Sequence, residues 1–198
     1  MSMLRRRREK RTDYKARLAL VKSRAPRLVV RRSLNNIHIQ VVNYVADGDK
    51  SVAETFSKNL SKYGWNYHGG SLPSSYLTGF LAGKLAVSKG INSAFLDLGM
   101  QNTTKGSSLF AAALGAKNAG LKIPIGNSIL PTEDRIKGKH ISAYASHLKK
   151  EDSKKYAKQF SSYIKLNADP EMLSHKFEEV KKKIEEEFHR NPKTEAKE

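Results

Sequence analysis

Arginine and lysine side chains crowd the first thirty-two residues of this 198-residue chain. This segment holds thirteen Lys and Arg against two acids, Glu9 and Asp13, within a chain whose net charge is +18. Positive charge concentrated at one end of a chain repels itself, and a polyanion relieves that repulsion. Because Lys and Arg displace condensed counterions from phosphates, the segment predicts nucleic-acid binding.

Predicted RNA-contacting residues extend from this segment into later parts of the chain. Arginine pairs with phosphates and stacks on bases, which suits an arm that folds on single-stranded or structured RNA. His38 is a candidate for stacking on a base, because strand alternation places its ring on the face of the strand opposite to Ile37 and Ile39. The predicted contacts are Arg5, Arg6, Arg7, Arg8, Lys10, Arg11, Tyr14, Lys15, Arg17 and Arg24 in the basic arm (residues 1–25), Arg27, Arg31, Arg32, Asn35, Asn36 and His38 in the hairpin that follows, and Lys105, Gly106 and Ser107 before a later helix.

The segment Lys105-Gly106-Ser107-Ser108 is only partly similar to a phosphate-binding loop. The nucleotide motif requires Gly-Lys-Ser/Thr after a spaced glycine, and the order here is Lys-Gly-Ser. Exposed amides at a helix N-terminus can nevertheless hold one phosphate of a nucleic-acid backbone. Helix capping by Ser107 is the alternative interpretation, and both can hold together.

The sequence offers little for catalysis or metal binding. There is no cysteine, which excludes disulfides and thiolate zinc sites, and the six histidines lack zinc-site spacing. Asp97 lies at the end of a predicted strand, where a catalytic metal ligand is often found, but a two-metal nuclease needs several convergent carboxylates. We therefore interpret Asp97 as a structural hydrogen-bond acceptor, and we expect no enzymatic activity, no cofactor and no metal.

Two other functional classes remain as alternatives. A metal-dependent nuclease on a ribonuclease H-like fold would cleave with divalent metal and lose that activity in Asp97→Asn. A binder of anionic membrane surfaces needs large apolar side chains, which are few in residues 12–22. No apolar run approaches the roughly 20 residues that cross a bilayer, so we expect no membrane partner.

Hydrophobic spacing predicts an α/β core between the arm and a charged helical tail, with domains at 1–25, 26–150 and 151–198. The apolar run 94–98 predicts a buried central strand, and Gly79 and Gly83 on one predicted helix permit close backbone packing. Strands are expected at 27–33, 37–43, 51–56 and 94–98, and helices at 12–23, 58–63, 74–88, 106–120, 140–150, 152–166 and 170–190.

Six ordered blocks of sequence resemble one protein family. They are LRRRREKRTDYKARLALVKSRAPRLVVRRS, YGWNYHGG, LPSSYLTGFLAGKLA, FLDLG, TKGSSLFAAALGAKNAGLKIP and ILPTEDRIKGKHISAYA. In this order they resemble the archaeal large-subunit ribosomal protein eighteen family, whose eukaryotic relative is large-subunit protein five. The resemblance covers residues 3–145 and continues weakly through DPEMLSHKFEEVKKKIEEEF.

This resemblance implies a fold, a function and a set of partners. The implied fold is three-layer α/β/α around a mixed sheet with ribonuclease H-like topology. The implied function is structural: a cytoplasmic ribosomal protein that binds 5S rRNA and helps attach it to 23S rRNA, beside neighbouring proteins of the central protuberance.

The family pattern also assigns residues by position. The RNA-contacting beginning of the family is matched by the basic arm from Arg5 to Arg11 and by Tyr14, Arg17, Arg27, Arg31 and Arg32. Lys105, Gly106 and Ser107 match the loop that meets the 5S RNA backbone. The first hairpin turn departs from the pattern. Ser33-Leu34-Asn35-Asn36 stands where Ser-Asn-Lys-His is usual, which removes positive charge from the turn.

Overall fold

The computed structural model describes residues 5–190, so the ends of the predicted arm and tail lie outside the described residues. Its centre is a mixed four-stranded sheet with the strand order β3-β2-β1-β4. The strands are β1 (Arg27–Arg32), β2 (Ile37–Val45), β3 (Gly48–Phe56) and β4 (Phe95–Asp97). The first three form an antiparallel meander, and β4 pairs in parallel with β1. The predicted α/β class with a parallel component is thus confirmed.

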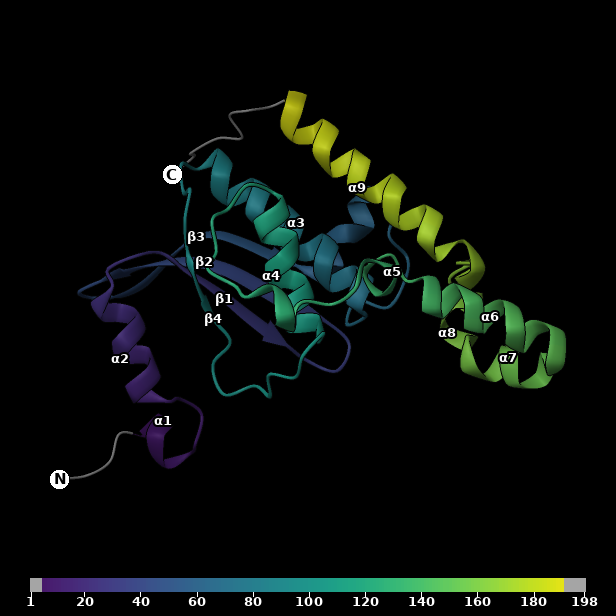
Figure 1. Cartoon of the computed structure of the whole chain (residues 1–198), viewed down its shortest axis with the longest axis horizontal. Helices are drawn as coiled ribbons and strands as arrows, with labels where there is room; N and C mark the ends of the chain where they lie inside the picture. The colour runs from purple at the N-terminus through teal and green to yellow at the C-terminus, as the bar shows by residue number, and fades with distance from the viewer. Residues whose placement is uncertain (1–4, 191–198) are drawn as a thin grey trace.

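One face of the sheet is covered by two helices, α3 (Leu72–Ser88) and α4 (Ser108–Asn118) (Figure 1). Strand alternation sends Leu28 and Val30 of β1 toward these helices, together with Ile37 and Ile39 of β2, and all four are fully buried. The helices approach each other at backbone distance. A Cβ atom added at Gly79 would lie 1.9 Å from the Ala112 carbonyl oxygen, so glycine is required there.

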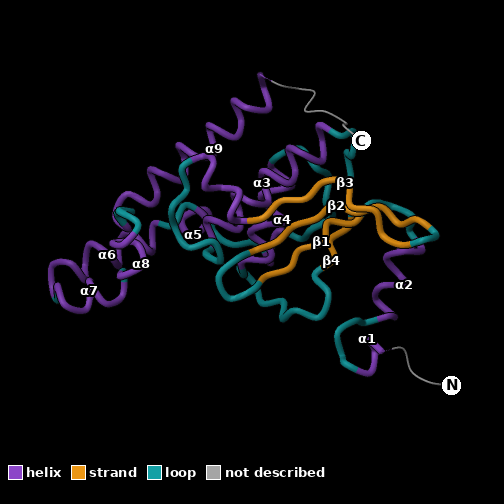
Figure 2. Tube along the Cα trace, turned by 180° about the vertical axis from the view of Figure 1, so that it is seen from behind, coloured by secondary structure: helices purple, strands orange, loops and turns teal. Residues whose placement is uncertain are grey.

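A last helix, α9 (Leu173–Arg190), packs over the outer side of α3 and over the 3₁₀ helix η1 (Ser57–Tyr63). Phe177, Val180 and Ile184 of α9 join Phe80 and Leu60 in a second buried cluster. The sheet, the α3–α4 pair and α9 therefore follow one another in layers, as the tube in Figure 2 shows with the orange strands beneath the helices.

Between α4 and α9 the chain forms a group of helices at the end of the molecule farthest from the arm (Figure 1). The helices α6 (Lys139–Glu151), α7 (Ser153–Gln159) and α8 (Ser161–Lys165) follow the short α5 (Glu133–Ile136), and η3 (Pro170–Met172) leads into α9. Residues 139–165 are called the helical extension below. They share a small apolar cluster of Ala145, Leu148 and Phe160.

The basic arm lies on the other side of the sheet from α3 and α9. It contains a single helical turn, α1 (Arg5–Arg8), and the helix α2 (Tyr14–Lys22), which confirms the predicted helix (Figure 1). No residue of α2 is buried, so this helix does not form the packed layer that a three-layer arrangement would place there.

The predicted central position of the strand at 94–98 was wrong. β4 lies at the edge of the sheet, and Phe95 is 40% exposed. Beyond β4, the described chain adds only an isolated parallel bridge between Ser93 and Lys122. The apolar run arises instead because Ala94 and Leu96 face the core, where both pack against the buried cluster.

Candidate nucleic-acid interface

The basic arm is shaped by local polar contacts rather than by a core. In α1, the Arg5 guanidinium lies 2.8 Å from the Glu9 carboxylate. Asp13 caps α2 by accepting hydrogen bonds from the backbone N–H groups of Lys15 and Ala16, at 2.9 and 3.1 Å. Asp13 thus fixes where the helix begins, while most of the arm's basic side chains stay exposed.

Five charged side chains join the arm to the sheet in an alternating series that we call the charge ladder: Arg17, Asp49, Arg27, Asp97 and Arg31. Arg17 of α2 lies 2.9 Å from Asp49, and Arg27 bridges Asp49 at 2.6 Å and Asp97 at 3.0 Å. Arg31 completes the series at 2.9 Å from Asp97. The side chain of Arg27 is 1% exposed, so its charge is satisfied within the protein.

Asp97 acts as the structural acceptor that the sequence predicted. One carboxylate oxygen accepts from Arg27, and the other accepts from Arg31 and from the backbone N–H of Gly99 at 3.0 Å. Both oxygens are therefore directed at donors of the protein itself. Among residues 5–190, no three Asp, Glu or His side chains converge in a metal-binding group.

The ladder also determines the charge state of Asp49. Burial acts to raise the pKa of this carboxyl, but hydrogen bonds and charge attraction from Arg27 and Arg17 outweigh burial. The pKa of Asp49 consequently lies below its ordinary value, and the carboxylate is ionised at neutral pH.

A cleft of about 610 Å³ separates the arm from the end of β4. Five of the predicted RNA-contacting residues line it: Arg6, Arg11, Tyr14, Arg17 and Arg31. On its other wall lie Leu98, Gly99 and Met100, directly after β4. The cleft thus opens at the carboxyl ends of the parallel strands. Its lining holds four guanidinium groups and only two carboxylates, those of Asp13 and Asp97, so positive charge predominates.

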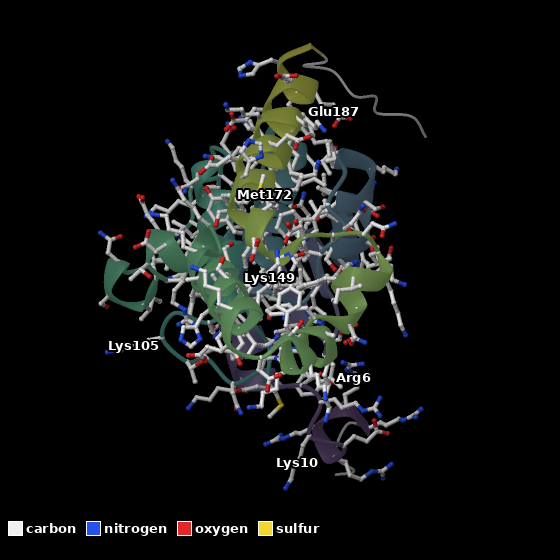
Figure 3. The ribbon with its side chains drawn as sticks, turned by 90° about the vertical axis from the view of Figure 1, so that its right-hand side faces the viewer. Arg6, Lys10, Lys105, Lys149, Met172 and Glu187 are labelled. Atoms are coloured by element: carbon white, nitrogen blue, oxygen red, sulfur yellow. The ribbon has the colours of Figure 1, made fainter. Side chains whose placement is uncertain are left out.

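The remaining arm residues face outward. Arg7, Arg8, Lys10, Lys15 and Arg24 are all exposed. Figure 3 places Arg6 and Lys10 at one end of the view with Lys105 toward the same end, whereas Glu187 of α9 lies at the opposite end. The basic arm and the Lys105 loop therefore lie on a common side of the molecule.

The hairpin residues are occupied by contacts within the protein. The Asn36 carboxamide oxygen accepts from the Ser57 hydroxyl at 3.1 Å, and His38 Nε2 lies 2.6 Å from Glu54 Oε1. Asn35 approaches His68 at 3.5 Å. At the turn, Leu34 is 89% exposed.

The Lys105 loop leads into the N-terminus of α4. Gly106 adopts φ +68°, a left-handed conformation that favours glycine. Ser107 is the N-cap residue, but its side chain makes no capping hydrogen bond. The structure therefore does not support the alternative interpretation of Ser107 as a helix cap. The hydroxyls of Ser107 and of Ser108, which is 6% exposed, are enclosed and have no partner among the described residues.

Arg135 is the residue of this loop region that the sequence analysis missed. Its Nη1 atom lies 3.8 Å from the position that a Cβ of Gly106 would occupy. The Arg135 guanidinium thus adds positive charge beside the N-terminus of α4, where the helix dipole already favours an anion such as a phosphate. The only signal for Arg135 is its place in the block ILPTEDRIKGKHISAYA, since 29 positions separate it from Gly106.

Two comparisons with known proteins agree with each other. Residues 2–94, which span the arm, the meander and α3, match the family described as ribosomal large subunit proteins 60S L5 and 50S L18. The large ribosomal subunit protein uL18 of Korarchaeum cryptofilum (strain OPF8) is 48% identical over 180 residues, covering 91% of each chain.

Proposed function

This chain belongs to the family of ribosomal large subunit proteins 60S L5 and 50S L18, a structural constituent of the ribosome, and we propose that it binds 5S rRNA. We further propose that it helps attach 5S rRNA to 23S rRNA in the central protuberance, beside neighbouring ribosomal proteins. The observation that carries the proposal is the arginine-lined cleft between arm and sheet, which suits phosphate groups.

In the proposed mechanism, some basic residues contact RNA phosphates and others hold the arm in place. Exposed side chains of the arm, such as Arg7, Arg8 and Lys10, neutralise RNA phosphates. Buried Arg27 acts as a positioning residue, because it holds Asp49 and Asp97 and thereby the arm. The Lys105 loop supplies a second phosphate site at the N-terminus of α4.

Discrimination among RNAs needs more than phosphate contacts. Phosphate contacts set affinity and register, whereas helix shape and unpaired bases distinguish one folded RNA from another. The cleft and the Lys105 loop lie at the same ends of the strands, so a folded RNA can meet both. We assign the recognition of 5S rRNA to the relative positions of the cleft and the Lys105 loop rather than to any single residue.

The strand arrangement supports the finer fold assignment as well. We propose a ribonuclease H-like relationship from the order β3-β2-β1-β4 with β4 parallel to β1. Within that scaffold the role is non-enzymatic, because Arg27 and Arg31 occupy the Asp97 oxygens that a nuclease would direct at metal ions.

Filter binding at several salt concentrations tests the proposal. If about six to ten phosphates are neutralised, affinity for 5S rRNA falls roughly 10³-fold or more between about 50 and 200 mM salt. Deleting residues 1–11 should flatten this dependence and reduce affinity at low salt. Transfer RNA at matched salt is the control for specificity, and equal affinity for both RNAs contradicts 5S recognition. An unchanged salt slope after the deletion contradicts the role of the arm.

A further inference from the structure

A second cavity, of about 420 Å³, lies between the helical extension and the core, away from the arm. We call it the extension cavity. Phe160, Tyr163 and Ile141 form part of its lining, and His68 reaches it from the loop before α3. Its volume falls in the range of about 300–1,000 Å³ that is usual for ligand sites.

The aromatic rings that line this cavity pack against one another, and Tyr144 remains exposed. Tyr163 stacks on Phe160 with ring centroids 5.9 Å apart, and Tyr67 meets Tyr163 edge-on at 5.4 Å. Tyr144 lies across from Phe160 at 6.4 Å and is 51% exposed. Rings fixed in this way offer flat faces on which another flat ring can stack.

Polar groups line the same space. The Gln159 carboxamide and the Ser162 hydroxyl each both donate and accept hydrogen bonds. His140 adds an imidazole, whose pKa is lowered by burial and by the nearby charge of Arg135, so the neutral ring presents one donor and one acceptor. Such groups match the edge of a nucleobase, which alternates donors and acceptors.

The charge of the surrounding helices favours RNA over a protein partner. Residues 139–165 contain seven lysines against two acids, Glu151 and Asp152. Three of these lysines form ion pairs, with Asp134, Glu171 and Asp152. The net charge of residues 139–165 is still positive, as a surface that approaches phosphates requires.

Arg135 links the extension cavity to the Lys105 loop. Arg135 lies beside Gly106 and its charge acts on His140, which lines the cavity. His68 lies on the cavity wall and approaches Asn35 of the hairpin. Arg135 thus connects the proposed phosphate site with the extension cavity.

We propose that the extension cavity binds one unpaired base of ribosomal RNA, stacked on Tyr144 and Tyr163 and hydrogen-bonded by Gln159 and Ser162. The inference rests on the proposed RNA-binding function and adds a site that reads a base to the arm and loop that hold phosphates. It also gives the helical extension a role in recognition.

Chemical footprinting of the full chain on reconstituted large subunits tests the inference. The variants are Tyr144→Ala, the conservative Tyr144→Phe, and Tyr44→Ala as the control, since Tyr44 is a similarly exposed tyrosine (49%) on β2. Probes of the Watson–Crick edges should find at least one nucleotide protected by the wild-type chain, Tyr144→Phe and Tyr44→Ala but reactive with Tyr144→Ala. Affinity for the RNA should fall about fivefold or more with Tyr144→Ala alone.

The outcomes separate this inference from the function on which it rests. An unchanged footprint and affinity with Tyr144→Ala overturns the base site while leaving RNA binding by the arm intact. Loss of a neighbouring protein from the particle, without any newly reactive nucleotide, identifies the cavity as a protein-docking site and also overturns the inference. A wild-type chain that protects no RNA contradicts the proposed function itself.

Discussion

Arg27 shows how one residue type serves two different purposes in the same segment. The sequence places it among the basic residues that meet RNA, and its neighbours on the arm are indeed exposed. Its own side chain is 1% exposed and is held between Asp49 and Asp97. The difference follows from strand alternation, which turns Arg27 toward two carboxylates that lie 22 and 70 positions away in the chain.

Removing Asp97 should therefore reduce stability. Asp97→Ala leaves Arg27 buried with one carboxylate fewer and Arg31 without its partner, so the free energy of unfolding should fall by about 3 kcal/mol. Urea denaturation measures this change. The control is Asp134→Ala, which removes the exposed ion pair with Lys139 and should change stability little. Equal effects of the two substitutions would contradict a structural role for the ladder.

Acid should weaken the same ladder at Asp49. Because the folded-state pKa of Asp49 lies below its unfolded value, its contribution to stability is complete above about pH 4 and is lost as the pH falls further. Urea midpoints measured from pH 6 down to pH 3 should decline more steeply for the wild type than for Asp49→Asn. Parallel declines would show that Asp49 does not contribute.

At the scale of elements, the contact between α3 and α4 depends on glycine. A Cβ at Gly79 would lie 1.9 Å from the Ala112 carbonyl oxygen, so Gly79→Ala forces the helices apart and should cost about 3 kcal/mol or more. Gly126→Ala is the matched control, because no atom lies within 4 Å of its added Cβ. Thermal melting compares the two variants, and a Gly79→Ala chain as stable as the control would refute the packing argument.

Much of the element order could be predicted from local sequence. The residue pattern predicted the three strands of the meander and the helix α2, and the spacing of Gly79 and Gly83 indicated a close helix neighbour. The edge position of β4 could not be predicted, because an apolar run shows that a strand is buried on its faces and not how many strands flank it. The ion pair of Arg17 with Asp49 and the position of Arg135 beside Gly106 were equally hidden, since each depends on distant segments meeting.

At the scale of the whole molecule, charge and position work together. The ladder contains a carboxylate, Asp49, whose removal makes the chain more positive. Simple charge counting predicts tighter RNA binding by Asp49→Asn, whereas loss of the contact to Arg17 frees α2 and predicts weaker binding. We expect the second effect to dominate, with affinity for 5S rRNA reduced severalfold in filter binding.

The neighbouring turn provides a control for this prediction. Asp47→Asn removes the same charge two residues away, at an exposed position outside the ladder, and should leave affinity unchanged or slightly raised. If both variants tighten binding equally, the arm needs no positioning and acts only through its charge.

Because no residue of α2 is buried, the arm should be sensitive to proteolysis while the protein is free of RNA. A helix without buried residues should detach from the sheet more readily than the core helices, and its exposed basic residues are then targets for proteases that cut after Arg and Lys. Copies made in excess of RNA would be clipped first and would lose the very residues that commit them to assembly.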